Sequence, residues 1–251
     1  MSVVTTERFA SFDGNELALH RLGAGRPVVL LHGLFSDAQT NWIRFGHAQR
    51  LADAGFEAIM PDLRAHGQSA RPRDPAAYPE DVLVRDAQAL VALLALQDYD
   101  LGGFSLGART AVRGVLAGLT PRRLVLGGMG LEGLAGWERR AAFFIDAIDR
   151  FETVKHGDPA FMAVAFMKTQ KVDRVAARLL LQSVDDTAPD ELADITVPTL
   201  VVCGDQDRDN GSPQALADAL PHGRFEEVPG THMSSVTEAG LGEAIARFLA
   251  A

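Results

Sequence analysis

Short apolar runs alternate with longer amphipathic stretches along most of this 251-residue chain. Runs such as 27–31 (PVVLL) and 198–203 (PTLVVC) suit strands that are buried on both faces of a parallel sheet. Stretches such as 80–97, with apolar residues at helical spacing, suit helices. The alternation predicts an α/β fold with a mostly parallel sheet flanked by helices.

The same patterns set the order of the predicted elements. Strands are expected over residues 3–12, 16–22, 27–31, 56–61, 99–103, 123–127, 198–203 and 224–228. The turn Asp13-Gly14-Asn15 joins the first two. Outside residues 131–190, helices are expected over residues 38–54, 80–97, 106–118, 212–220 and 235–250.

The sequence between the strands at 123–127 and 198–203 is too long for a single crossover helix. Amphipathic patterns fall near residues 136–151, 158–168 and 172–183. We therefore predict a helical cap over about 131–190, inserted into a core made of 1–130 and 191–251.

The charge of the chain limits its partners. It has 24 Lys and Arg against 33 Asp and Glu, a net charge of −9. Such a chain lacks the basic surface that binds nucleic acid or anionic lipid, so neither partner is expected. The single cysteine, Cys203, excludes an internal disulfide and fits a reducing compartment. Because no signal-peptide pattern or membrane-length apolar run is visible, a cytoplasmic location is expected; the oligomeric state is not indicated.

The motif Gly103-Phe104-Ser105-Leu106-Gly107 lies where a strand should turn sharply into a helix. Glycines on both sides of Ser105 remove side chains that would clash in so tight a turn. The turn would expose the hydroxyl at the carboxyl edge of the sheet, where reactive groups gather in α/β folds. Ser105 is the predicted nucleophile.

A serine hydroxyl needs a base, and the base needs a carboxylate. His232 follows the last predicted strand and precedes the last helix, which places it at the same edge as Ser105. Asp207, three residues beyond Gly204, is the preferred acid. Asp205 and then Glu132 are alternatives, because each also follows a predicted strand.

Two backbone N–H groups are predicted to stabilise an oxyanion. One belongs to Leu106, at the start of the helix after Ser105. The other belongs to Leu34, in the loop after strand 27–31, with Phe35 as the alternative donor. His32 is expected to fix this loop by hydrogen bonds.

These motifs together resemble the α/β-hydrolase superfamily, in particular single-domain serine hydrolases of the esterase type with a short helical cap. The matching segments are His32-Gly33, Asp62-Leu63-Arg64-Ala65-His66-Gly67-Gln68-Ser69, Gly103-Phe104-Ser105-Leu106-Gly107, Gly204-Asp205-Gln206-Asp207 and Gly230-Thr231-His232. The resemblance implies an eight-stranded α/β-hydrolase fold. Serine at position 105 argues against dehalogenases and epoxide hydrolases of this fold that use an aspartate nucleophile.

The predicted cap supplies candidates for substrate binding. Phe143, Phe144 and Phe166, together with Phe35, favour an apolar acyl or alkyl group. No motif places an arginine against a substrate carboxylate, although Arg109, Arg139 and Arg140 remain open.

The sequence thus predicts a serine hydrolase that cleaves small to medium, mainly apolar carboxylic esters without a cofactor or metal. A lactone, a thioester or the carbon–carbon bond of a β-diketone is an alternative substrate for the same three residues. A ligand-binding receptor that keeps the fold without turnover is the alternative from another class.

Overall fold

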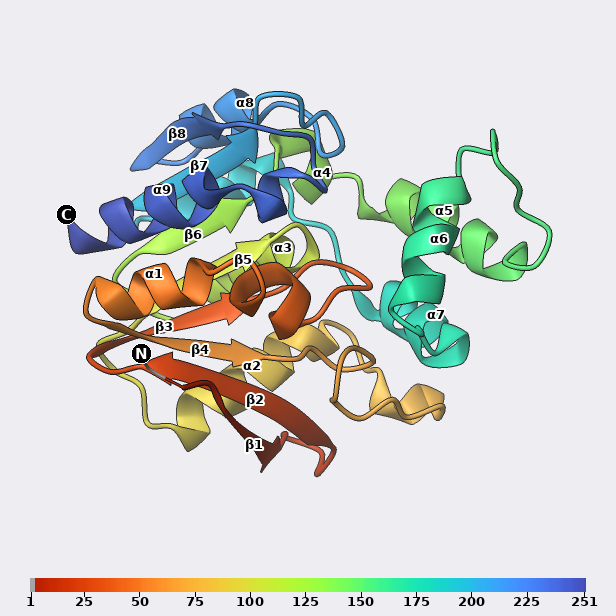
Figure 1. Cartoon of the computed structure of the whole chain (residues 1–251), viewed down its shortest axis with the longest axis horizontal. Helices are drawn as coiled ribbons and strands as arrows, with labels where there is room; N and C mark the ends of the chain where they lie inside the picture. The colour runs from red at the N-terminus through yellow and green to blue at the C-terminus, as the bar shows by residue number, and fades with distance from the viewer. Residues whose placement is uncertain (1–2) are drawn as a thin grey trace.

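The computed structural model describes residues 3–251 and contains one eight-stranded sheet (Figure 1). The strand order is β1-β2-β4-β3-β5-β6-β7-β8. The strands are β1 (Thr5–Ala10), β2 (Glu16–Gly23), β3 (Arg26–Leu31), β4 (Phe56–Pro61), β5 (Asp100–Phe104), β6 (Leu124–Gly127), β7 (Thr199–Gly204) and β8 (Gly223–Val228). Each overlaps a strand predicted from the sequence.

The sheet is parallel from β4 to β8 and antiparallel only at one edge. β2 pairs antiparallel with β1 and β4, whereas β3, β4, β5, β6, β7 and β8 pair in parallel. The central strands β3 and β5 are apolar and buried, as expected for strands covered on both faces. The predicted α/β-hydrolase fold with a mostly parallel sheet is confirmed.

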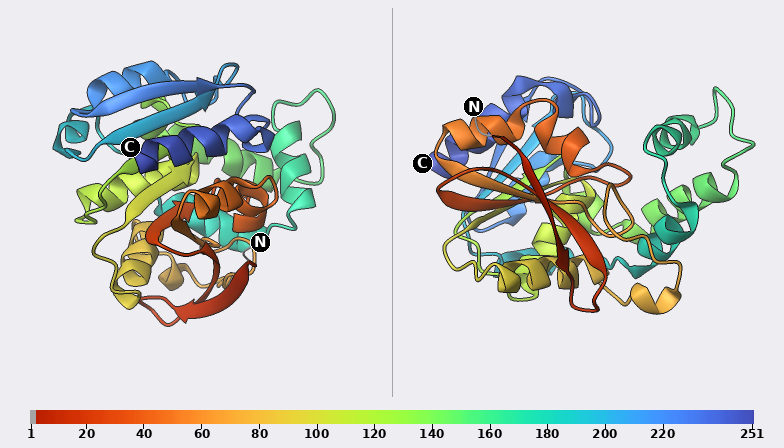
Figure 2. Two further views of the ribbon diagram at one scale, coloured as in Figure 1. Left: turned by 60° about the vertical axis from the view of Figure 1, so that its left-hand side comes forward. Right: turned by 60° about the horizontal axis from the view of Figure 1, so that its bottom comes forward.

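Helices cover both faces of the sheet (Figure 2). One buried cluster joins the sheet to α1 (His47–Asp53) and α9 (Ala239–Ala250). The other joins it to α2 (Val82–Leu93), α3 (Leu106–Leu116) and α8 (Pro213–Ala219). No helix within residues 3–251 is long and apolar enough to cross a membrane.

Two predicted helices are interrupted in the structure. The prediction of one helix over 38–54 was wrong, because a π-helical turn, Gln39–Ile43, is separated from α1 by Gly46 at φ 79°. The last predicted helix, 235–250, is divided into a 3-10 turn, Ser235–Thr237, and α9. A 3-10 turn, Pro75–Ala77, also precedes α2.

Four α-helices follow β6 before the chain returns to β7. They are α4 (Leu131–Leu134), α5 (Trp137–Asp149), α6 (Phe161–Thr169) and α7 (Arg174–Ser183), followed by a 3-10 turn at Pro189–Asp194. α5, α6 and α7 lie beyond the carboxyl ends of the parallel strands (Figure 1). The exact bounds of a cap over 131–190 stay a prediction.

Candidate active site

Ser105 lies at the turn between β5 and α3. Its backbone has φ 53° and ψ −112°, a conformation that costs an L-residue on the order of 1–3 kcal/mol. A Cβ on Gly103 would overlap the backbone of Gly107, and one on Gly107 would overlap the Leu31 carbonyl. The Ser105 N–H donates to the carbonyl oxygen of Gly127 at 2.8 Å, which ties the strained turn to β6.

His232 and Asp207 are hydrogen-bonded and buried. His232 Nδ1 lies 2.8 Å from Asp207 Oδ2. The His232 ring also packs on the ring of Phe104, with centroids 5.1 Å apart, so the imidazole lies beside the residue that precedes Ser105. In the described chain the Ser105 hydroxyl makes no hydrogen bond with His232. Such bonds are often long before substrate binds and tighten afterwards.

The Asp207 carboxylate is held ionised by its neighbours. Burial by itself would raise its pKa, but the hydrogen bond and charge of His232 outweigh burial, and the pKa lies below its usual value. The other oxygen, Oδ1, accepts the N–H of Asp209 at 3.0 Å. An ionised carboxylate favours the proton on Nδ1 of His232, which leaves Nε2 as an acceptor.

The alternative acids hold backbone groups instead. Asp205 Oδ1 accepts the N–H of Gly230 at 2.8 Å, and Glu132 Oε2 accepts the N–H of Ser212 at 2.7 Å. Among these three carboxylates only that of Asp207 is hydrogen-bonded to His232 in the described chain. The geometry therefore favours Asp207 over both alternatives.

The predicted oxyanion donors can be compared by their hydrogen bonds. The N–H of Phe35 donates to Nε2 of His66 at 2.9 Å, so the alternative donor is already occupied. The N–H groups of Leu34 and Leu106 have no acceptor among residues 3–251. These are the two donors predicted from the sequence, and neither is used by another residue of the described chain.

Two buried histidines join the loop after β3 to the loop after β4. His66 accepts from Phe35 across the gap, and His32 Nε2 accepts the N–H of Leu63 at 2.9 Å in the opposite direction. Each Nδ1 lies 2.8–2.9 Å from a carbonyl of its own loop, Gly33 for His32 and Arg64 for His66. The two rings meet edge to face, with centroids 5.1 Å apart.

Both imidazoles must be neutral to accept these bonds. Burial, followed by the repulsion that a protonated His32 would exert, lowers the pKa of His66 from 6.5 to about 3, and burial also lowers the pKa of His32. The predicted loop-fixing role of His32 agrees with these contacts. The partnership of His66 with Phe35 was not predicted, because the sequence marks His66 only as part of a loop motif.

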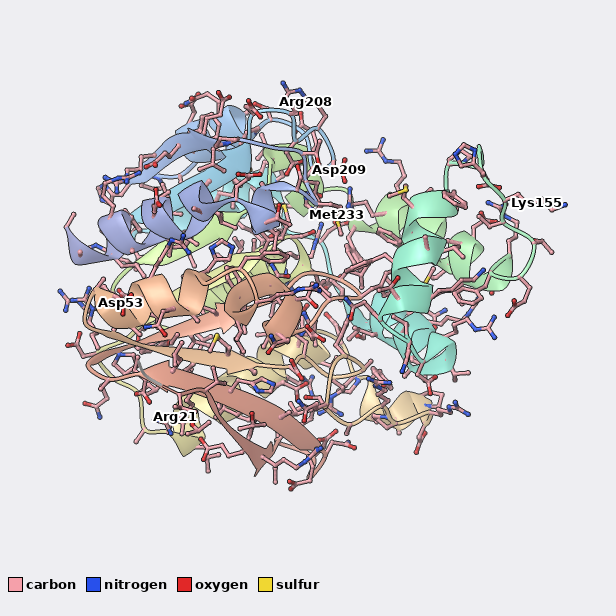
Figure 3. All side chains as sticks on the ribbon, viewed as in Figure 1. Arg21, Asp53, Lys155, Arg208, Asp209 and Met233 are labelled. Carbon is pink, nitrogen blue, oxygen red and sulfur yellow. The ribbon has the colours of Figure 1, made fainter. Side chains whose placement is uncertain are left out.

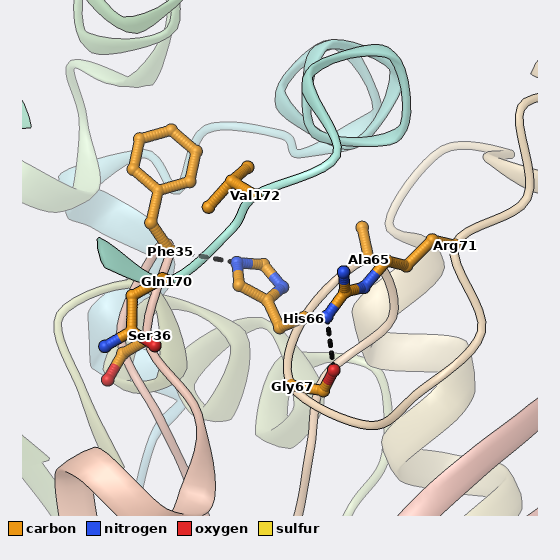
Figure 4. Close-up of a pocket in the computed structure, with 8 residues that line it drawn as sticks. All are labelled: Phe35, Ser36, Ala65, His66, Gly67, Arg71, Gln170 and Val172. Carbon is orange, nitrogen blue, oxygen red and sulfur yellow. Dashed lines mark hydrogen bonds between the residues drawn. The ribbon is translucent and has the colours of Figure 1, made fainter. Parts of the chain in front are cut away.

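A small pocket lies where these loops meet the segment after α6 (Figure 4). It is lined by Phe35, Ser36, Ala65, His66, Gly67, Arg71, Gln170 and Val172. The Arg71 guanidinium donates to the Gly67 carbonyl on its wall. Within residues 3–251, no group of three or more His, Cys, Asp or Glu side chains is arranged to hold a metal ion.

Three of the four predicted substrate-binding aromatics form one row. The ring of Phe35 meets that of Phe144 on α5 at 5.5 Å, and Phe144 meets Phe143 at 5.2 Å. Phe143 remains 40% exposed. Phe166, on α6, is half-buried and makes no such ring contact in the described chain. The row connects the loop that carries Leu34, the predicted oxyanion loop, to α5, and Phe166 lies outside the row.

Comparisons with known proteins agree with this architecture. A model described as "Alpha/beta hydrolase family" matches residues 28–243. The AB hydrolase superfamily protein YisY of Bacillus subtilis is 36% identical over 98 residues, a match that spans 39% of this chain and only 34% of that relative.

Two solved structures share the fold over almost their whole length. An esterase from Exiguobacterium antarcticum superposes with a TM-score of 0.79 at 19% identity, covering 97% of this chain and 99% of that one. A bromoperoxidase from Bacillus anthracis gives 0.74 at 22% identity, covering 98% and 99%. At such identities the likeness concerns the fold alone. Because the family model spans most of the sequence, this protein belongs to the alpha/beta hydrolase family.

Proposed function

We propose that this protein is a serine hydrolase that cleaves small to medium, mainly apolar carboxylic esters through an acyl-enzyme. One observation carries the proposal: Ser105 is held in a strained turn beside a buried His232–Asp207 pair. Strain of this kind persists where the surrounding structure maintains it, and such sites are often functional. Family membership supports hydrolysis, and the bond cleaved is inferred from the site.

In the proposed reaction, Ser105 Oγ attacks the ester carbonyl carbon while Nε2 of His232 takes the hydroxyl proton. The carbonyl oxygen becomes an oxyanion that accepts the N–H groups of Leu34 and Leu106. The intermediate then collapses, and the alcohol leaves with the proton held by His232. Water, deprotonated by His232, attacks the acyl-enzyme and releases the acid and free Ser105. Asp207 keeps the imidazole oriented and stabilises its charged form.

The substrate class is inferred from the aromatic residues near the site. The rings of Phe35 and Phe144 pack edge to face where the loop that carries Leu34 meets α5, and an apolar pair at this position favours an apolar acyl or alkyl group. Lactones, thioesters and β-diketones would place a similar carbonyl at Ser105, so they belong in the same substrate screen. A receptor without turnover is the remaining alternative.

The test compares initial rates on p-nitrophenyl acetate, butyrate and octanoate. We expect Ser105→Ala and His232→Ala to lose at least about 10³-fold in kcat. His222→Ala, at an exposed histidine, serves as the matched control and should keep full activity. Turnover that survives Ser105→Ala would refute the mechanism. No turnover of any ester, with ligand-dependent thermal stabilisation, would favour the receptor.

A further inference from the structure

Three arginines near α5 were open candidates for a substrate carboxylate, and the structure separates them. Arg109 is committed to the protein, since it donates to the carbonyls of Gly133 and Asp185. Arg139 is exposed on α5. Arg140, the next residue, is half-buried and donates from Nη1 to the carbonyl of Asp209 at 2.6 Å.

Arg140 has no carboxylate partner within ion-pair distance in the part of the chain that is described. Its single hydrogen bond there uses one nitrogen, which leaves Nε and Nη2 with uncommitted N–H donors. Burial lowers the pKa of Arg140, although the nearby charges of Asp209 and Asp207 act in the opposite direction. A partly buried guanidinium without an ion-pair partner is costly unless an anion joins it.

Arg140 contacts residues beside the candidate active site. Its anchor, Asp209, belongs to the loop that carries Asp207, and Asp209 and Met233 lie on the side of the core that faces α5 (Figure 3). The Arg140 Cζ is 5.8 Å from the ring centroid of Phe144, which in turn packs on Phe35 of the oxyanion loop. Arg140 and Phe144 therefore connect the acid loop, which carries Asp207 and Asp209, with the predicted oxyanion loop.

We propose that Arg140 binds a carboxylate carried by the substrate, so that the preferred substrates are half-esters of dicarboxylic acids. This inference rests on the proposed esterase function. Phe35 and Phe144 would contact the methylene chain, and the free edge of the guanidinium would receive the distal carboxylate as a pair of parallel N–H···O bonds. Because the whole chain is acidic, this local positive charge is what would make an anionic ester acceptable.

The test compares esters that differ only in the distal group. Monomethyl succinate, glutarate and adipate are assayed by pH-stat against methyl butyrate, valerate and hexanoate, respectively. The three pairs differ in chain length, and so in the distance from the ester carbonyl at Ser105 to the distal carboxylate. For at least one pair, we expect the half-ester to have a kcat/KM at least tenfold above that of its uncharged counterpart. Arg140→Gln should raise KM for that half-ester by about 10- to 100-fold and change the uncharged ester less than threefold.

Two variants control the interpretation. Arg139→Gln removes the neighbouring exposed charge and should leave both rates unchanged. Arg140→Lys keeps a positive charge without the planar fork and should retain part of the preference. A thermal melt shows whether each variant folds.

The outcomes separate this inference from the esterase proposal. Turnover of methyl valerate without preference for any half-ester, or an equal loss on both esters in Arg140→Gln, overturns the role of Arg140 alone. If no ester is turned over, the esterase proposal fails. Calorimetric binding of monomethyl glutarate to the wild type and to Arg140→Gln then decides the Arg140 site by itself, with equal affinities contradicting it.

Discussion

Nδ1 of His232 lies 2.8 Å from Oδ2 of Asp207, and both side chains are buried. This contact orients the imidazole so that Nε2, the other ring nitrogen, is the one left to accept a proton. The Asp207 carboxylate accepts a second bond from the Asp209 N–H, so its own orientation is fixed as well.

Asp207→Asn should lower kcat by about 10²–10⁴, because an amide cannot enforce the productive tautomer of His232 or stabilise its charged form. Asp205→Asn is the control, since Asp205 bonds the backbone of Gly230 and not the imidazole. It should have a much smaller effect on p-nitrophenyl butyrate turnover. Equal losses in the two variants would reopen the choice of acid.

His66→Gln should flatten the dependence of stability on pH. The folded chain keeps His66 neutral down to about pH 3, whereas the unfolded chain takes up a proton near the ordinary pKa of 6.5. The free energy of unfolding therefore falls as the pH decreases from 6.5 towards 3. Glutamine offers an acceptor to Phe35 without titrating. Urea unfolding at pH 7 and at pH 5 measures the slope.

The exposed His222 gives the control for that experiment. His222→Gln should leave the slope as in the wild type, because the exposed His222 side chain takes no part in the buried bond between His66 and Phe35. A slope that is the same in His66→Gln and in the wild type would contradict the neutral, buried state of His66.

Gly107→Ala should lower the free energy of unfolding by about 1–3 kcal/mol or more, because a Cβ there overlaps the Leu31 carbonyl. Gly240→Ala is the matched control in α9, where a Cβ meets nothing closer than 3.6 Å. That variant should stay within about 1 kcal/mol of the wild type. Urea unfolding reports both values. If Gly107→Ala leaves the free energy of unfolding unchanged, a Cβ at position 107 does not overlap the Leu31 carbonyl.

Phe144→Ala should reduce kcat/KM for p-nitrophenyl octanoate about tenfold and that for the acetate much less. The long acyl chain loses an apolar wall, whereas the acetyl group barely reaches it. Met162→Ala, on α6 and 71% exposed, is the control and should change neither ester. An equal loss of kcat/KM on both esters would show that Phe144 does not contact the long acyl chain.

The sequence predicted the strands well because buried parallel strands are continuous apolar runs bounded by turns. It failed within 38–54, where a left-handed Gly46 splits a pattern that otherwise continues as a helix. Periodicity reports which side chains face the core, but it does not report where the backbone breaks between two helical segments.

Site residues carried by local motifs, such as Ser105, were predictable, because the tight turn itself requires flanking glycines. Contacts between distant loops were not. The bond between Phe35 and His66 joins residues 31 positions apart, and no local spacing encodes it. Arg139 and Arg140 are adjacent in sequence, so only the packing of α5 against the acid loop distinguishes the exposed arginine from the half-buried one.

We propose that Ser105 is a nucleophile activated by His232. Incubation with a fluorophosphonate, followed by peptide mass spectrometry, tests it most directly. We expect rapid covalent labelling at Ser105 that is abolished by Ser105→Ala and by His232→Ala. Labelling at another residue, or labelling of Ser105 at an undiminished rate in His232→Ala, would contradict it.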